Sequence, residues 1–391
     1  MTQNVTCYPS LPSRTGFLAQ ISMKYFTYSI GVTLLCLVLA FAWGGGLTSP
    51  QGGLTAMVLA LILGIMEVSL SFENAVANAL VLKTMNARWQ KLFLTVGMVI
   101  AVFGMRLVFP ILIVAMATGQ SLHTVALMAF QHPEEYSRYL EQSHTYISAF
   151  GGTFLFLVFL HFMLDDAKER HWIAVIEKRL MKLGKLDSVQ AMLSLVLLLI
   201  LYRFLPLGEV ERVSMLVAGI SGIVLYILVS SFDVFLMDEE KTPDDSVIGP
   251  AQRAGIIGFI YLEVLDASFS FDGVIGAFAV TRDLVIIILG LSIGAMFVRS
   301  LTVFMVEKGT LDAYVYLEHG AHWAIGILAG IMLAGISVHI PEIITGLSGV
   351  IVILVSLISS ESYRLAQLKQ PSGILVSCGS LLGLRGNKKS T

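Results

Sequence analysis

Apolar runs of close to twenty residues recur along the whole chain, and they constrain its fold more than any other feature. A helix needs about 20 apolar residues to cross a hydrocarbon core roughly 30 Å thick. Only 13% of the residues are charged, whereas soluble domains carry about 25%. Membrane barrels would instead show short segments of alternating polarity. We therefore expect an all-α fold, a polytopic transmembrane helical bundle.

The runs predict about ten spans, and the positive charges predict their orientation. The spans are 25–43, 54–82, 92–117, 146–164, 188–205, 213–236, 254–280, 284–306, 320–339 and 343–360. With a cytoplasmic N-terminus, 19 of the 25 Lys and Arg residues fall in inner segments and four in outer segments. Because positive charge is retained inside, this bias predicts a multi-pass protein of the inner (cytoplasmic) membrane with both termini in the cytoplasm.

These spans divide the chain into nine segments. They are a polar leader at 1–24, in which Met23 is a candidate natural start, an N-terminal anchor span and loop at 25–53, a first transport repeat at 54–166, a basic cytoplasmic loop at 167–187, two connecting spans at 188–236, an acidic cytoplasmic linker at 237–253, a second transport repeat at 254–339, a last span at 340–360 and a basic cytoplasmic tail at 361–391. The mixed-charge run at 165–185 is typical of a solvated or interfacial amphipathic helix.

One acidic motif occurs twice inside the apolar runs. The stretch "EVSLSFEN" (67–74) matches "DASFSFDG" (266–273) in the positions of its acids, serines and phenylalanine. Arg106 and Arg299 then follow at matching positions, each nine residues after a glycine. Five predicted spans separate the two copies, and an odd number reverses the direction of the chain. The sequence thus predicts an inverted repeat of three helices plus three helices, an arrangement whose binding site lies near the membrane midplane.

The four motif acids, Glu67, Glu73, Asp266 and Asp272, are predicted to lie inside the membrane. An ionised side chain at the bilayer centre costs at least ~2.5 kcal/mol, so a functional role is the first interpretation. The alternative is a structural ion pair, or a protonated acid that is hydrogen-bonded between helices. On a straight helix Glu67 shares one face with Ser71, Asn74 and Asn78, and Asp266 shares one with Ser270. Gly273, Gly276 and the serines favour local unwinding of the motifs.

Carboxylate, amide and hydroxyl oxygens suit hard divalent cations such as Ca²⁺, Mg²⁺ and Mn²⁺. Arg106 and Arg299 are candidate counter-ions that hold an acid ionised, or, in the alternative interpretation, arginines that snorkel to the interface. Four acids and two arginines sum to −2, the charge that one divalent cation would neutralise.

With these residues in place, the chain resembles a divergent branch of the TerC family, integral membrane proteins named for tellurium resistance within the lysine-exporter-like superfamily. The resemblance lies in "EVSLSFENAVANA", "DASFSFDGVIGAF", Arg106 and Arg299, and extends over roughly 54–339. It implies efflux of a divalent metal, with manganese (Mn²⁺) favoured. By motif match it implies the metal-handling residues Glu67, Glu73, Asn74, Asp266 and Asp272.

Three functions remain open. The first is a secondary transporter that exports a divalent cation with proton coupling, the second an amino-acid or organic-cation exporter, and the third a membrane scaffold for stress-response (tellurite) proteins of the cytoplasm. No enzyme is expected, because GxGD and HExxH motifs are missing from the sequence. The net charge of −2 favours no nucleic-acid partner, and no cofactor besides the transported ion is expected. The lipid bilayer and further copies of the chain are the other expected partners.

Overall fold

The computed structural model describes residues 23–46, 48–166, 168, 170–184, 188–237, 250–338 and 340–369. Some side chains within helices, including that of Asp272, lie outside the description. Every element of the described chain is a helix. The predicted polar leader falls almost entirely outside these residues, as do most of the acidic linker and much of the basic tail.

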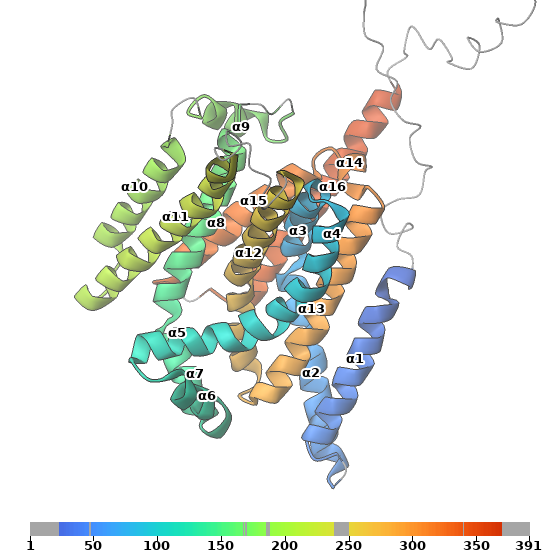
Figure 1. Ribbon diagram of the computed structural model, residues 1–391, viewed down its shortest axis with the longest axis vertical. Helices are drawn as coiled ribbons and strands as arrows, with labels where there is room; N and C mark the ends of the chain where they lie inside the picture. The colour runs from blue at the N-terminus through green and yellow to red at the C-terminus, as the bar shows by residue number, and fades with distance from the viewer. Residues whose placement is uncertain are drawn as a thin grey trace, which may run out of the picture.

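The helices pack as one bundle (Figure 1). Their bounds are α1 (Met23–Trp43), α2 (Pro50–Leu70), α3 (Phe72–Thr84), α4 (Ala87–Leu92), η2 (Phe93–Gly97), η3 (Ile100–Val108), α5 (Phe109–Thr118), α6 (Leu122–Gln131), α7 (Pro133–Gln142), α8 (His144–Leu164), α9 (Ala174–Met181), α10 (Val189–Phe204), α11 (Glu209–Met237), α12 (Pro250–Val280), α13 (Leu284–Glu307), α14 (Thr310–Ala313), α15 (Leu317–Gly335) and α16 (Glu342–Lys369).

The all-α membrane fold is confirmed, and the count of spans differs from ten. Among the described residues seven helices are long and apolar enough to cross a membrane, namely α1, α2, α8, α11, α13, α15 and α16. A bent pair, Ala87–Gly97 with Ile100–Met116, makes an eighth candidate. The other two predicted spans are helical as well. However, α10 has only 16 residues, and α12 includes side chains outside the description.

The predicted span 54–82 is two helices, because the chain breaks at Ser71. Ser71 has φ −107° and ψ 16°, and its backbone N–H still donates to the carbonyl oxygen of Glu67. The interruption therefore falls inside the first acidic motif. In the second motif α12 is continuous, so the local unwinding expected at Gly273 and Gly276 is wrong for that copy.

The predicted span 92–117 bends by 42° at a short break after η2. Both η2 and η3 are π-helices, which are rare and frequently lie at functional sites. Each wider π turn changes the direction in which the following side chains point. The bend leaves α5 lying across the bundle in Figure 1, whereas α4 follows the direction of its neighbours.

The two predicted repeats run in opposite directions in the bundle. In Figure 1, α2 and α3 run toward the end that carries α9, and α12 runs away from it. The packing partners also correspond. The motif helix α2 of the first repeat packs on α13 of the second, and the motif helix α12 of the second repeat packs on η3 of the first. The third helices of the two repeats, α8 and α15, pack on each other. The first motif helices, α2 and α3, touch α12, so both copies of the motif meet at the centre of the structure.

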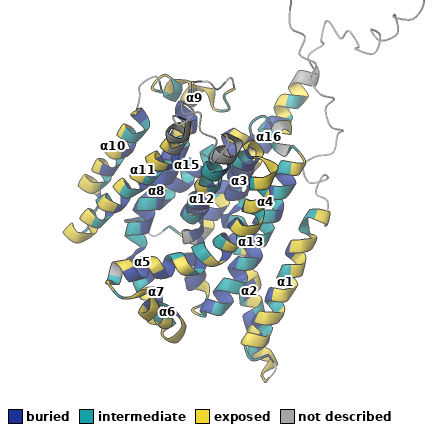
Figure 2. Cartoon of the chain, in the orientation of Figure 1, coloured by how far each residue is buried: buried dark blue, intermediate teal, exposed yellow. Residues whose placement is uncertain are grey.

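The bundle is apolar on its outside as well as in its core. Figure 2 shows much exposed surface on α1, α10 and α11, and large hydrophobic side chains there are exposed, for example Leu34, Leu199 and Val224. Because water would not solvate such a surface favourably, these faces fit contact with lipid. The buried polar groups lie instead between the central helices, where the candidate site is found.

Candidate functional site

A buried ion pair joins the first motif to the bent span. Arg106, on the π-helix η3, is 3% exposed, and its guanidinium donates to the carboxylate of Glu67, which is 1% exposed. A second N–H of Arg106 donates to the carbonyl oxygen of Ala101 at 2.6 Å. The hydroxyl of Ser71 donates to the same Glu67 oxygen at 2.9 Å. Arg106 therefore acts as the counter-ion of Glu67 in this conformation.

Two glycines from the other repeat make room for Glu67. A Cβ added at Gly273 on α12 would lie 2.6 Å from Glu67 Oε2. A Cβ at Gly294 on α13 would overlap the Glu67 side chain itself. Any larger residue at these positions would displace the carboxylate. The glycine that replaces a polar residue in the second motif thus has a steric role.

The second motif meets the first through Asn74 and Asp266. The amide of Asn74 donates to Asp266 Oδ1 at 2.5 Å, and both side chains are buried. These two residues line a small internal cavity of about 20 Å³ together with Asn78, Arg106 and Glu263. A cavity needs roughly 10–15 Å³ to hold one water molecule, so this one has room for a single water or a bare ion. Residues from both repeats therefore surround one ion-sized space.

Glu73 lies apart from this cavity, at the start of α3. It is 1% exposed, and its carboxylate packs against Gly349 of α16, where an added Cβ would overlap it. No residue of α16 belongs to either copy of the predicted repeat. The structure thus separates the two acids of the first motif, Glu67 and Glu73.

Several buried oxygens near the motifs have no hydrogen-bond partner among the described residues. They are Glu73 Oε2, Asn74 Oδ1, Asn78 Oδ1, both carboxylate oxygens of Glu263, Asp266 Oδ2 and Ser270 Oγ. Burying such a group without a partner costs about 1–3 kcal/mol, more when it is charged. Among the described side chains, no three His, Cys, Asp or Glu residues lie close enough together to hold a metal ion. Asp272, the fifth predicted metal-handling residue, lies outside the described side chains.

The two arginines are not equivalent. Arg299 is partly buried, donates its Nε–H to the carbonyl oxygen of Leu94 at 2.9 Å and lies over the ring of Tyr28 at 5.7 Å. It also borders the small cavity. Unlike Arg106, it forms no ion pair within the described part of the chain. The counter-ion interpretation therefore fits Arg106 and not Arg299 in this conformation.

Glu263 is the main residue that the sequence analysis missed. It is 8% exposed and lies one helical turn before Asp266, and an added Cβ at Gly97 would lie 2.6 Å from its Oε1. In the first copy the position that matches Glu263 is Gly64. Gly64 lies close to Gly290, just as Glu263 lies close to Gly97, which is the glycine that matches Gly290. Comparing the motif copies alone therefore hides this acid. Its spacing of three residues from Asp266, on one face of a helix, was the available signal.

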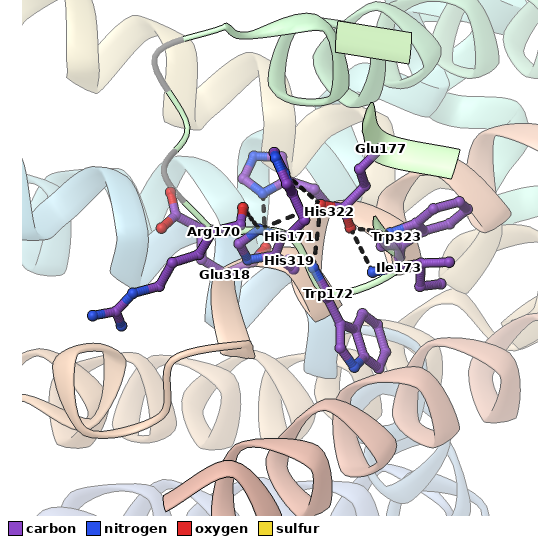
Figure 3. A network of polar contacts seen from close by, with 9 residues as sticks. All are labelled: Arg170, His171, Trp172, Ile173, Glu177, Glu318, His319, His322 and Trp323. Atoms are coloured by element: carbon purple, nitrogen blue, oxygen red, sulfur yellow. Dashed lines mark hydrogen bonds and ion pairs between the residues drawn. The ribbon is translucent and has the colours of Figure 1, made fainter. Parts of the chain in front are cut away.

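A second polar cluster lies around Glu177, far from the motifs in sequence (Figure 3). Glu177 is fully buried. Its carboxylate accepts hydrogen bonds from the backbone N–H groups of Trp172 and Ile173 and from the indole N–H of Trp323. His171 and His319 lie 3.6 and 3.5 Å from its Oε2.

This cluster adds a buried acid to the mixed-charge run, in which the sequence predicts a solvated or interfacial amphipathic helix. The only helix in the described part of the loop is α9, with eight residues, and its Glu177 points into the protein. The preceding residues are tied to α15 by His319, which donates to the carbonyl oxygen of Arg170 at 2.9 Å. Burial lowers the pKa of nearby Lys168, and the negative charges of Glu177, Asp165 and Glu318 oppose that shift. The loop is therefore folded onto the bundle.

Comparison with known proteins gives one match. A family model described as "Protein of unknown function (DUF475)" matches residues 72–366, from the start of α3 into α16. This span includes Arg106, Glu263 and Asp266, and it begins after Glu67. No curated protein and no solved structure matches the chain.

Proposed function

The chain belongs to the family of proteins of unknown function DUF475, and we propose that it is a secondary transporter that exports a divalent metal cation. The observation that carries this proposal is the set of buried carboxylate and amide oxygens that lack a partner within the described part of the chain, where the two predicted repeats meet. These oxygens are ligands that hard divalent cations prefer. Inverted repeats that place such a site at their interface are typical of secondary transporters.

The resemblance to the TerC family supports manganese as the favoured substrate and export as the direction. It also supports a location in the inner membrane with both termini in the cytoplasm. In this proposal Glu67, Asn74, Glu263 and Asp266 handle the ion in the small cavity, and Glu73 provides a further carboxylate on its route.

Arg106 competes with the cation in this mechanism. In the present conformation it neutralises Glu67, and the acids whose side chains are described do not converge on one point. To coordinate Glu67 and Asp266, a divalent cation has to displace Arg106 from Glu67 and Asn74 from Asp266. Because a carboxylate ligand must be deprotonated, binding of the cation is linked to release of protons from these acids.

An exporter of amino acids or organic cations is the second candidate. The size of the small cavity argues against it, since about 20 Å³ admits a water or an ion and no amino acid. A membrane scaffold is the third candidate. It would place no demand on the charge of the buried motif acids.

The test is the manganese content of cells that overexpress the protein during manganese exposure. Wild type should lower the content relative to cells with the empty vector. Glu73→Gln and Asp266→Asn should return it to the vector level, because each removes a charge needed to compensate the cation. Glu134→Gln is the matched control, since Glu134 is an exposed acid paired with Arg282 at the surface.

Membrane abundance of each variant is measured in parallel. Unchanged manganese content in all strains would overturn the proposal. Wild-type behaviour of both motif variants would favour the scaffold.

A further inference from the structure

A second cavity, of about 550 Å³, lies where α2, α7, α8, α12, α15 and α16 meet. We name it the vestibule; its lining includes Leu70, Glu141, His144, Ile275, Met332 and Thr345. It shares no lining residue with the small cavity beside Arg106. A divalent cation with six waters occupies roughly 180 Å³, at about 30 Å³ per water, so the vestibule has room for a hydrated ion.

Leu70 is the residue of the first motif that belongs to this lining. It is the last residue of α2, 8% exposed, and precedes the break at Ser71. Its side chain packs against α16 at Gly346, where an added Cβ would lie 3.0 Å from Leu70 Cδ2. Thr345, the residue before Gly346, lines the vestibule, whereas Glu73 does not line it.

Positions along α16 give the order of these groups. Gly346 holds Leu70, and Gly349, three residues further on, holds the Glu73 carboxylate. Three residues of helix correspond to about 4.5 Å along its axis. The sequence of contacts from the vestibule inward is therefore Thr345, Leu70 and then Glu73. Glu73 Oε2 is buried and has no hydrogen-bond partner among the described residues.

We propose that the vestibule is the aqueous port for a hydrated divalent cation and that Leu70 is the gate between this port and Glu73. The inference rests on the proposed transport function for the identity of the ion. An apolar constriction blocks a charged species, because the ion would have to shed water without gaining a polar ligand. Beyond Leu70 the Glu73 carboxylate supplies such a ligand. Movement of one leucine side chain would connect the two.

The test measures the access of a cationic thiol reagent, methanethiosulfonate ethyltrimethylammonium, to purified protein in detergent. Cys7, Cys36 and Cys378 are first replaced by alanine, and one reporter cysteine is introduced as Glu73→Cys or Ile275→Cys. Mass spectrometry gives the rate of labelling. Ile275→Cys in the vestibule should label rapidly whether or not Leu70 is present. Glu73→Cys should label slowly with Leu70 and about tenfold faster with Leu70→Ala, because truncation removes the packed side chain.

Leu63→Ala is the matched control, since Leu63 is a fully buried leucine of α2 that lines neither cavity. Equal labelling of Glu73→Cys with Leu70 and with Leu70→Ala would overturn the gate, as would an equal acceleration by Leu63→Ala. Slow labelling of Ile275→Cys would overturn the port. If Glu73→Cys does not fold, Ser71→Cys serves as the reporter.

Labelling needs no metal ion, so the result is independent of the manganese measurement. A gated port without manganese export would keep this inference and reject the proposed substrate. Manganese export without a gated port would do the reverse.

Discussion

At the scale of single residues, the Arg106–Glu67 pair makes the sharpest prediction. Arg106→Met should destabilise the protein by about 3–5 kcal/mol, because it leaves a buried carboxylate without its cation. The double variant Arg106→Met with Glu67→Gln should recover much of that loss, since neither charge remains. Thermal unfolding in detergent measures both. Equal unfolding temperatures for the single and double variants would show that the pair is not coupled.

The glycines that hold the acids make a second prediction. Gly349→Ala should lower the unfolding temperature and abolish manganese export, because its methyl group would overlap the Glu73 carboxylate. Gly330→Ala on α15 is the control, since nothing lies within 4 Å of its added Cβ. That change should be neutral or stabilise the helix by roughly 0.5–1 kcal/mol. The prediction fails if the two variants unfold and export alike.

The residues of the site were accessible from the sequence to different degrees. Comparing the two motif copies identified Glu67, Asp266 and Arg106. Asn74 came from the helix face that it shares with Glu67 and from the family resemblance. The structure brings these four residues together. That comparison treated Arg299 as equivalent to Arg106, although the inverted repeat does not make their surroundings identical. Glu263 was missed although its spacing of three residues from Asp266 was a signal in the sequence. The glycines that pack against the acids became evident only from contacts between segments distant in sequence.

At the scale of elements, the π-helix η3 determines where Arg106 points. Deleting Phe103, an exposed residue of η3, allows the segment to return to α-helical geometry. The remaining side chains should then rotate by about 100°, the turn of one residue in an α-helix. We expect a loss of stability similar to that of Arg106→Met and a loss of manganese export.

Deletion of Gln120, in the turn after α5, is the control for shortening the chain. It should leave the orientation of Arg106 unchanged. Equal effects of the two deletions on unfolding temperature would reject a specific role for the π-helical turns.

The elements themselves were largely predictable, because each apolar run is long enough to form a membrane helix. The breaks within them were predictable only in part. The serines of the first motif favoured local unwinding, and the chain breaks at Ser71. The π turns of η2 and η3 were not expected, because they depend on the packing of η3 against α12 and α13, which a local pattern does not contain. The same is true of Glu177, whose burial depends on α15.

At the scale of the whole molecule, the topology is open to direct labelling. Figure 1 places the turn after α1 and helix α6 at one end and α9 at the other. In a cysteine-free background, Thr48→Cys and His123→Cys should react in intact cells with an impermeant thiol reagent. Lys182→Cys should react only after the membrane is permeabilised. Labelling of all three in intact cells would contradict the predicted orientation.

The polarity of α12 has a consequence for how the chain is assembled in the membrane. Its apolar stretch contains Glu263, Asp266 and Asp272, and an acid near the centre of an inserting helix costs about 2.5–3.5 kcal/mol. Because of this unfavourable insertion free energy, α12 does not move readily from the translocon into lipid by itself. The groups that receive it, Asn74 on α3 and the bent span, are synthesised earlier. Membrane insertion therefore follows an order: the first repeat must already be in the bilayer when α12 of the second repeat inserts.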